Sequence, residues 1–220
     1  MDKKHLPINL LIIEDNRYVR SGWEAVLTMN EGFQIIGSYA NCEDAIKDDK
    51  FGDADVILMD IGLPGMNGIE CVSFIKERHP EKIIVMCTVH EDDDKIFNAI
   101  CAGAVGYLLK KTPPDELIAS LKDAYNGGSP MTPSVARKVI ASFHKTTIQK
   151  NKDDVELTER ENQILSMMAE GKSYTAIARE IFLSLDGVYY HIRHIYEKLQ
   201  VHSRAEAVAK GIQKKIIKPM

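Results

Sequence analysis

Five polar side chains in the first half of the chain stand where short apolar runs end. Glu14 and Asp15 follow one run, Asp60 follows another, Thr88 ends a third and Lys110 follows a fourth. Carboxylates held close together repel one another unless a cation lies among them, and a ligand set made only of oxygens favours Mg²⁺. If folding gathers these residues, they form a magnesium site with a reactive carboxylate, a hydroxyl and an ammonium.

Asp60 is the residue that we expect to react. Its carboxylate can attack phosphorus, while the metal neutralises phosphoryl oxygens and Lys110 pairs with another of them. In the segment VILMDIGLPGMNG, the glycines after Asp60 allow the backbone to turn sharply and leave the carboxylate open. These glycines, Gly62, Gly65 and Gly68, lack the spacing and the lysine of a phosphate-binding P-loop.

Elements must bring these residues together, and the first 127 residues show the required pattern. Short runs rich in Ile, Val and Leu alternate with amphipathic stretches, one of which carries Val19, Trp23, Val26 and Leu27 on one helical face. The predicted strands cover residues 8–14, 33–39, 56–60, 83–88 and 105–109. This alternation predicts an α/β domain with a doubly wound five-stranded parallel sheet, whose functional edge lies at the carboxyl ends of the strands.

The remainder of the chain shows helix starts and no strand pattern. Thr132 and Pro133 predict a helix over 133–144, and residues 146–154 have almost nothing to bury, which is typical of a flexible linker. Further helices are predicted over 159–170 and 174–181, from a cap at Ser184 to Leu199, and after Ser203. Thr158 with Glu161, and Ser203 with Glu206, have the spacing of a capping box. We therefore expect a first domain over 1–128, a linker over 129–154 and a helical domain over 155–220.

The third of these helices has two distinct faces. A predicted buried stripe contains Val188, Ile192, Ile195 and Leu199. The predicted exposed side contains Tyr189, Tyr190, Arg193, Tyr196 and Glu197. An exposed helix face with aromatic side chains and a cation suits entry into the major groove of DNA.

The charge of the chain is split between its two parts. Residues 1–130 carry 13 Lys and Arg against 22 Asp and Glu, a net −9, whereas residues 131–220 carry +5, which together give the net charge of −4. A basic part joined to an acidic part indicates that only the former meets a polyanion.

The cysteines and the amino-terminal run bear on the compartment. The four cysteines, Cys42, Cys71, Cys87 and Cys101, include no CxxC pair, so we expect them to be reduced and the protein to be cytoplasmic. The apolar run near the amino terminus is interrupted by Glu14 and Asp15, which makes it too short for an export signal or a membrane span.

The motifs IIED, LMDIGLPGMNG, CT and GAVGYLLK, over about residues 7–128, resemble the CheY-like phosphoacceptor receiver domain of bacterial two-component response regulators. The resemblance implies that Glu14, Asp15, Asp60 and the Gly62 carbonyl hold Mg²⁺. It also implies that Asp60 accepts phosphate, which Thr88 and Lys110 contact. Tyr107 matches the aromatic switch residue of the family, with plain packing against the sheet as the alternative.

The motifs LTERE, EGKSYTAIA, HIRHIYEKL and VHSRAEAV, over about residues 155–215, resemble the LuxR/NarL-type helix-turn-helix. The resemblance implies that the third helix reads DNA through Tyr189, Tyr190 and Arg193, with Lys198 near phosphates. Gly187 and Tyr189 stand where the family usually has threonine and lysine. The alternative is therefore a domain that binds DNA poorly or reads an unusual site.

Together these features predict a DNA-binding transcriptional response regulator and not an enzyme. The expected partners are a sensor histidine kinase that phosphorylates Asp60 and a two-half-site DNA operator bound as a homodimer, with RNA polymerase as a further candidate and no membrane. A phosphatase with an aspartate nucleophile generally needs an acid two residues later, where this chain has Gly62. The remaining alternative is an atypical regulator whose DNA binding does not depend on phosphorylation.

Overall fold

The computed structural model describes residues 6–144, 157–201 and 203–218. The chain divides into two compact units, Met1–Arg137 and Lys138–Met220, which we describe separately. The predicted linker at 146–154 lies outside the described residues. Within the described ranges, every helix is too short or too polar to cross a membrane.

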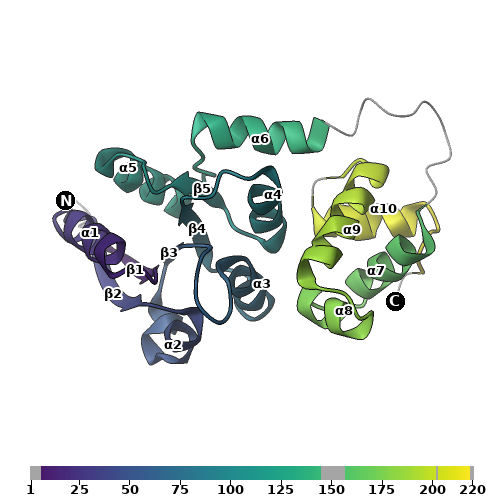
Figure 1. Ribbon diagram of the computed structural model, residues 1–220, viewed down its shortest axis with the longest axis horizontal. Helices are drawn as coiled ribbons and strands as arrows, with labels where there is room; N and C mark the ends of the chain where they lie inside the picture. The colour runs from purple at the N-terminus through teal and green to yellow at the C-terminus, as the bar shows by residue number, and fades with distance from the viewer. Residues whose placement is uncertain (1–5, 145–156, 202, 219–220) are drawn as a thin grey trace. The chain divides into compact units, whose positions relative to one another are not determined.

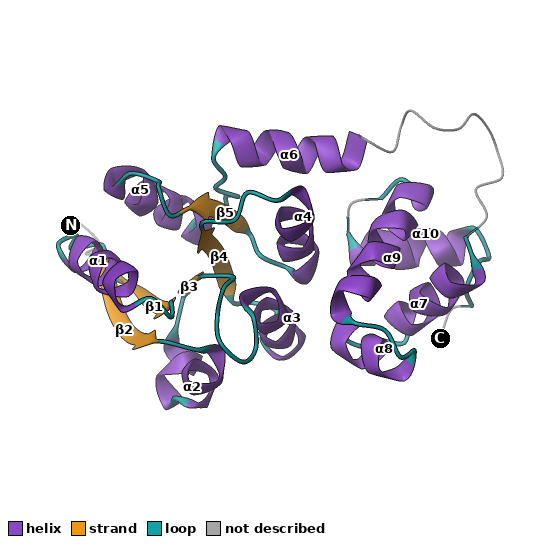
Figure 2. Ribbon diagram, in the orientation of Figure 1, coloured by secondary structure: helices purple, strands orange, loops and turns teal. Residues whose placement is uncertain are grey.

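The first unit is built on a five-stranded parallel sheet with strand order β2-β1-β3-β4-β5 (Figure 2). The strands are β1 (Ile8–Ile13), β2 (Phe33–Tyr39), β3 (Val56–Met59), β4 (Ile83–Thr88) and β5 (Gly106–Leu109). All five predicted strands are confirmed, with Glu14, Asp60 and Val105 lying just outside the paired segments. Strands buried on both faces explain why their sequences are continuous apolar runs.

Helices cover both faces of this sheet (Figure 1). They are α1 (Arg17–Thr28), α2 (Cys42–Lys47), the 3₁₀ turn η1 (Asp49–Asp53), α3 (Gly68–Arg78), α4 (Asp93–Ala102) and α5 (Pro114–Tyr125). Figure 1 shows α1 and α5 on one side of the sheet and α2, α3 and α4 on the other. Trp23 and Leu27 of α1 join Leu117 and Leu121 of α5 in a buried cluster over the central strands. This packing fixes the strand ends from which the functional side chains project.

The edge strand β5 is covered by the segment that follows α5. The Tyr107 amide donates to the Pro130 carbonyl at 2.9 Å, and Tyr107 pairs with Met131 as an isolated parallel bridge. A Cβ at position 106 would come within 2.8 Å of the Pro130 ring, so this close contact requires Gly106. The chain then continues into α6 (Pro133–His144), which confirms the helix predicted from Thr132 and Pro133.

The described part of the second unit contains four further helices. They are α7 (Glu159–Ala169), α8 (Tyr174–Glu180), α9 (Leu185–Leu199) and α10 (Arg204–Gln213). Thr158 and Glu161 form the predicted capping box, with both reciprocal hydrogen bonds present. Ser184 and Ser203 each accept a hydrogen bond as N-cap residues, as predicted. Left-handed backbone at Gly171 follows the end of α7, which is where the sequence predicted a stop.

The expectation that all four cysteines are reduced is wrong for one pair. Cys42 and Cys71 form a disulfide, with their Cα atoms 6.3 Å apart, whereas Cys87 and Cys101 are thiols. Cys42 begins α2 and Cys71 is the fourth residue of α3, and these two helices lie on one face of the sheet (Figure 1). Proximity of this kind depends on the packing of helices, which the spacing of cysteines along the sequence does not reveal.

Candidate functional site: an acidic pocket at the strand ends and an exposed helix face

Backbone hydrogen bonds continue the sheet one residue beyond the strands and so place the pocket residues side by side. The Asp60 amide donates to the Ile13 carbonyl at 3.0 Å, and the Lys110 amide donates to the Thr88 carbonyl at 2.9 Å. In a parallel sheet, the carboxyl ends of neighbouring strands lie at the same edge. Glu14, Asp60, Thr88 and Lys110 therefore meet at one edge although they are far apart in the sequence.

Lys110 bridges two carboxylates of this edge. Its Nζ lies 2.6 Å from Glu14 Oε2 and 2.9 Å from Asp60 Oδ2. The other oxygen of each carboxylate accepts a backbone hydrogen bond, from the Asn16 amide to Glu14 Oε1 at 3.0 Å and from the Ile61 amide to Asp60 Oδ1 at 2.7 Å. The predicted convergence of carboxylates and ammonium is thus present in the structure.

Burial and ion pairing oppose one another in this pocket. Burial raises the pKa of Glu14 above its usual range, although the hydrogen bonds from Lys110 and Asn16 work in the other direction. Burial lowers the pKa of Lys110, but the hydrogen bonds to Glu14 and Asp60 outweigh it, so that the pKa of Lys110 is raised. Lys110 therefore stays charged over the whole physiological range and supplies one positive charge to the pocket.

The pocket suits a hard divalent cation. Glu14, Asp15 and Asp60 each offer a carboxylate oxygen, and these oxygens lie within 4.8 Å of one another. Glu14 and Asp60 are buried, whereas Asp15 is exposed and leaves one side open to solvent. Three carboxylates against one ammonium leave a negative surplus, and an oxygen-only set of this kind fits Mg²⁺.

The loop after Asp60 is held close to the Asp60 carboxylate. A Cβ placed on Gly62 would lie 3.4 Å from Asp60 Oδ2, so Gly62 borders the carboxylate directly. A Cβ on Gly68 would fall 2.0 Å from the Asp60 carbonyl oxygen, which requires glycine at the start of α3. Gly65 has a left-handed φ of 74°. Gly65 thus allows the turn of the loop, and Gly68 allows its close packing against Asp60.

Thr88, His90 and Tyr107 form a connected group beside the pocket. Thr88 is fully buried, and its Oγ1 accepts a hydrogen bond from the His90 amide at 3.4 Å. The Tyr107 hydroxyl donates to the His90 carbonyl at 3.0 Å. Tyr107 is also fully buried, and burial together with nearby carboxylates raises the pKa of its hydroxyl, which remains a hydrogen-bond donor. His90 therefore links Thr88 to Tyr107 through its backbone.

The outward face of α9 differs from the sequence-based expectation. Tyr189 and Tyr196 are 1% and 2% exposed, so the prediction that they lie on the outer face is wrong. The Tyr189 ring packs against Tyr174 at 5.6 Å between centroids, and the Tyr174 and Tyr196 hydroxyls lie 3.2 Å apart. Tyr189 therefore belongs to the core of the second unit and is not available to face DNA bases.

Tyr190 lies on the outer face of α9, as the sequence indicated, whereas the Arg193 side chain is only 20% exposed. The Tyr190 side chain is 61% exposed and its ring lies 4.5 Å from that of His194, one helical turn away. Arg193 Nε lies 3.3 Å from Glu197 Oε1. His194 was missed in the sequence, although its spacing of four residues from Tyr190 places both on one helix face. This part of α9 carries the exposed Tyr190 ring, the His194 imidazole and the partly buried Arg193 guanidinium.

Lys198 is engaged inside the second unit. Its Nζ lies 2.6 Å from Glu161 Oε2, and Glu161 is only 4% exposed. Burial raises the pKa of Glu161, but the hydrogen bonds from Lys198 and from the Thr158 amide outweigh it and hold that pKa below its usual range. The expected role of Lys198 near phosphates therefore competes with an ion pair that joins α9 to the start of α7.

Comparisons with known proteins identify two families along the chain. Residues 10–122 match the family described as the response regulator receiver domain, and residues 155–210 match the bacterial regulatory proteins of the luxR family. The nitrate/nitrite response regulator protein NarL of Escherichia coli K12 is 30% identical over 96% of this chain and 97% of its own. The transcriptional regulatory protein YdfI of Bacillus subtilis 168 is 33% identical over 94% and 97%. Among solved structures, the response regulator ChrA of a heme-sensing two-component system is 26% identical with a TM-score of 0.53, covering 97% of this chain and 100% of that one.

Proposed function

The chain belongs to the two-component response regulators that join a receiver domain to a LuxR-type DNA-binding domain, and from this premise we propose that phosphorylation of Asp60 controls its binding to DNA. Proteins of this family regulate transcription and are not enzymes. The observation that carries the proposal is the pairing of Lys110 with both Glu14 and Asp60 at 2.6 and 2.9 Å. This pairing places an ammonium directly beside the Asp60 carboxylate, where a phosphoryl group would be added.

The phosphodonor in this proposal is a phosphohistidine of a partner sensor kinase. A carboxylate oxygen of Asp60 attacks phosphorus, the new oxygen–phosphorus bond forms, and the phosphorus–nitrogen bond breaks. The electron pair of that bond stays on the departing imidazole, which takes up a proton from solvent. Lys110 stabilises the negative charge that the phosphoryl group brings into the pocket. Mg²⁺ bound by Glu14, Asp15, Asp60 and the Gly62 carbonyl would neutralise further phosphoryl charge.

The response to phosphorylation begins at Thr88 in this proposal. A phosphoryl oxygen competes with the existing partner of Thr88, the His90 amide, whose hydrogen bond is long at 3.4 Å. Because the His90 carbonyl accepts from Tyr107, a change at Thr88 reaches the proposed switch residue. Charge-assisted hydrogen bonds from Thr88 and Lys110, at roughly 1.5–3 kcal/mol each, together approach the ~5.5 kcal/mol that inverts a two-state population.

For the second unit, we assign DNA contact to the outer face of α9. Tyr190 and Arg193 would reach base edges in the major groove, as the LuxR-type resemblance implies. We further propose that the protein binds a two-half-site operator as a homodimer in the cytoplasm, with α10 as the candidate dimer contact and RNA polymerase as a further candidate partner.

Phosphorylation is tested with a small phosphodonor such as acetyl phosphate in the presence of Mg²⁺. We expect the full chain to be labelled and the Asp60→Asn variant to remain unlabelled. Asp49→Asn is the matched control, because Asp49 is an exposed aspartate of η1 outside the pocket. Equal labelling of the native chain and the Asp60→Asn variant would remove Asp60 from its role.

Control of DNA binding is tested by gel shift against genomic fragments with and without phosphodonor. We expect phosphodonor to tighten binding of the native chain and to leave the Asp60→Asn variant unchanged. Operator binding that ignores the phosphodonor would instead favour the phosphorylation-independent regulator. Tyr190→Ala should cost roughly 1–3 kcal/mol of binding free energy if Tyr190 contacts a base. Tyr125→Ala, at an exposed tyrosine of α5, is the control that should leave binding unchanged.

A further inference from the structure

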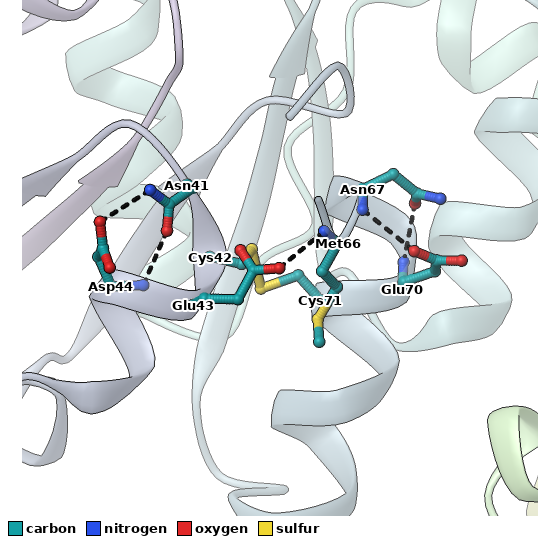
Figure 3. Close-up of a disulfide and its surroundings, with 8 residues drawn as sticks. All are labelled: Asn41, Cys42, Glu43, Asp44, Met66, Asn67, Glu70 and Cys71. Carbon is teal, nitrogen blue, oxygen red and sulfur yellow. Dashed lines mark hydrogen bonds between the residues drawn. A yellow bond between two sulfur atoms is a disulfide. The ribbon is translucent and has the colours of Figure 1, made fainter. Parts of the chain in front are cut away.

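The disulfide lies beside the loop that carries the phosphoacceptor. Figure 3 shows the bond between Cys42, at the start of α2, and Cys71, within α3. The 29-residue separation between them means that the bond closes a covalent loop, and that loop contains β3 and Asp60. Cys71 is three residues from Gly68, which packs directly against the Asp60 carbonyl. A covalent link at Cys71 is therefore close to the backbone of the reactive residue.

A second link joins the same two segments. Glu43 follows Cys42, and its Oε1 accepts a hydrogen bond from the Met66 amide at 2.9 Å (Figure 3). The same carboxylate fills the space beside Gly65, where a Cβ would come within 2.6 Å of Glu43 Oε1. The disulfide and the Glu43 contact thus hold residues 65–71 from one side, and Gly62 lies only a few residues before this anchored segment.

We propose that Cys42 and Cys71 are a reversible oxidation site, whose closure holds the loop after Asp60 in the arrangement that cation binding and phosphorylation require. The inference rests on the proposed function, because it concerns the rate at which Asp60 accepts phosphate. A protein that binds DNA works in a reducing compartment, where disulfides that do form are transient and regulatory. The buried sheet and its flanking helices form a hydrophobic core that does not depend on the bond. We therefore assign the bond to positioning the loop after Asp60.

The oxidation step needs a small disulfide such as glutathione disulfide as the oxidant. The thiolate of one cysteine attacks a sulfur of the oxidant, releasing one glutathione thiolate and leaving a mixed disulfide. The second cysteine then displaces the other glutathione, and the Cys42–Cys71 bond forms. In sum, two protein thiols lose two protons and two electrons, and the oxidant becomes two thiols.

Access to the bond requires opening of α2, because both cysteine side chains are fully buried. This helix has six residues and buries only two small side chains, Cys42 and Ala45. Elements with few buried contacts open at low cost in free energy, so exchange with a small thiol is feasible in the folded protein. Cys87 is an unsuitable competitor, since it is buried in β4 and burial raises the pKa of its thiol to about 12.

The state of the bond and its effect on the pocket can be measured separately. Thiol labelling before and after reduction counts the cysteines in the bond. Mg²⁺ affinity is measured by calorimetry and by the fluorescence of Trp23, the single tryptophan, whose ring lies 5.9 Å from Lys110 Nζ. The rate of Asp60 phosphorylation is measured with acetyl phosphate. Each measurement uses the full chain, oxidised with glutathione disulfide or reduced with dithiothreitol.

We expect reduction to weaken Mg²⁺ binding and to slow phosphorylation by about fivefold each, the lower end of typical coupling between sites. The double variant Cys42→Ser with Cys71→Ser should behave as the reduced protein in either medium. Cys101→Ser, at a cysteine of α4 outside the covalent loop, should keep the full response. Equal Mg²⁺ affinity and equal rates in the two redox states would overturn the proposal, as would failure of glutathione disulfide to form the bond. If the redox state changes Mg²⁺ affinity but Asp60 is not labelled in either state, the proposed function is refuted. The effect of the Cys42–Cys71 bond on the pocket would still be supported.

Discussion

Each of the two units buries a glutamate against a lysine, but the charges in the two places sum differently. In the second unit, Lys198 Nζ lies 2.6 Å from Glu161 Oε2. Glu161 also closes the capping box at the start of α7, so its remaining hydrogen-bonding capacity serves the helix. This ion pair joins α9 to the start of α7.

In the first unit, one lysine faces a larger set of carboxylates. Lys110 lies within 2.9 Å of both Glu14 and Asp60, and Asp15 is part of the same cluster. The ammonium therefore cannot neutralise the group, and the surplus negative charge attracts a cation. In this chain, the lysine that faces several carboxylates lies at the proposed reaction site, whereas Lys198 joins two helices.

The strongest test of this difference is removal of Lys110. Lys110→Met should slow phosphorylation of Asp60 by roughly 10²–10³-fold, because a positive charge that meets the developing phosphoryl charge is lost. Mg²⁺ affinity should stay the same or rise, since the pocket becomes more negative. Both are measured with acetyl phosphate and calorimetry, with Lys111→Met, an exposed neighbour, as control. Loss of Mg²⁺ binding in the Lys110→Met variant would mean that Lys110 is structural like Lys198.

Removal of Lys198 should act on stability instead. Lys198→Met leaves Glu161 buried without its cation, which should lower the free energy of unfolding of the second unit by about 3 kcal/mol. Urea unfolding followed by far-UV circular dichroism measures this loss. Trp23 fluorescence should not change, because the single tryptophan lies in the first unit. Combining Lys198→Met with Glu161→Gln should recover most of the loss, and a double variant no more stable than the single one would contradict the account.

A capping box at the start of one helix in each unit extends the comparison. Asn67 with Glu70 begins α3, and Thr158 with Glu161 begins α7, with the same reciprocal hydrogen bonds. Asn67→Ala and Thr158→Ala should each cost about 1 kcal/mol of unfolding free energy. Only Asn67→Ala should also slow phosphorylation, because Asn67 ends the loop that follows Asp60. A phosphorylation defect of equal size in the Thr158→Ala variant would show that the effect is not local.

The smallest effect that we expect is an opposite pH dependence of the two glutamates in metal-free buffer. The pKa of Glu14 is raised by burial, so its contribution to stability is full below the ordinary glutamate pKa of 4.5 and is lost as pH rises through the raised pKa. The pKa of Glu161 is lowered overall, since the hydrogen bonds from Lys198 and Thr158 outweigh its burial, so its contribution is present above 4.5 and is lost as pH falls through the lowered pKa.

Urea unfolding at a series of pH values between neutral and acid checks these signs. Trp23 fluorescence reports the first unit, and the remaining dichroism change reports the second. Glu14→Gln and Glu161→Gln should each flatten the corresponding dependence. The same slope in both units would show that the balance of charge around each glutamate does not set its titration.

The acidic pocket could be predicted because its signal is local. Each pocket residue follows an apolar run, and the rule that parallel strands end at one edge converts five separate positions into one site. The outer face of α9 was harder, because α9 packs against α7, α8 and α10 at once. Its buried side is therefore wider than the stripe of Val188, Ile192, Ile195 and Leu199 and includes Tyr189 and Tyr196. An amphipathic tyrosine gives no sign in the sequence of which side it takes.

The contacts that no pattern predicted are those that depend on tertiary packing. Cys42 and Cys71 meet because α2 and α3 lie on the same face of the sheet, and Lys198 meets Glu161 because α9 crosses the start of α7. Arg20 donates to the Glu14 carbonyl at 2.6 Å, and its position in α1 gave no indication of that contact. Such pairings follow from the fold and become visible only with it.

The way in which β5 is covered has a mechanical consequence. The Tyr107 amide is hydrogen-bonded to Pro130, and α6 begins three residues later at Pro133. The segment that leads into α6 is therefore hydrogen-bonded to the backbone of Tyr107. A shift of the β5 backbone would therefore move Pro130 and the start of α6 as well, whether or not the Tyr107 ring changes its position. This contact also occupies part of the β5 edge, so a second chain cannot pair with Tyr107 there without displacing the segment at Pro130 and Met131.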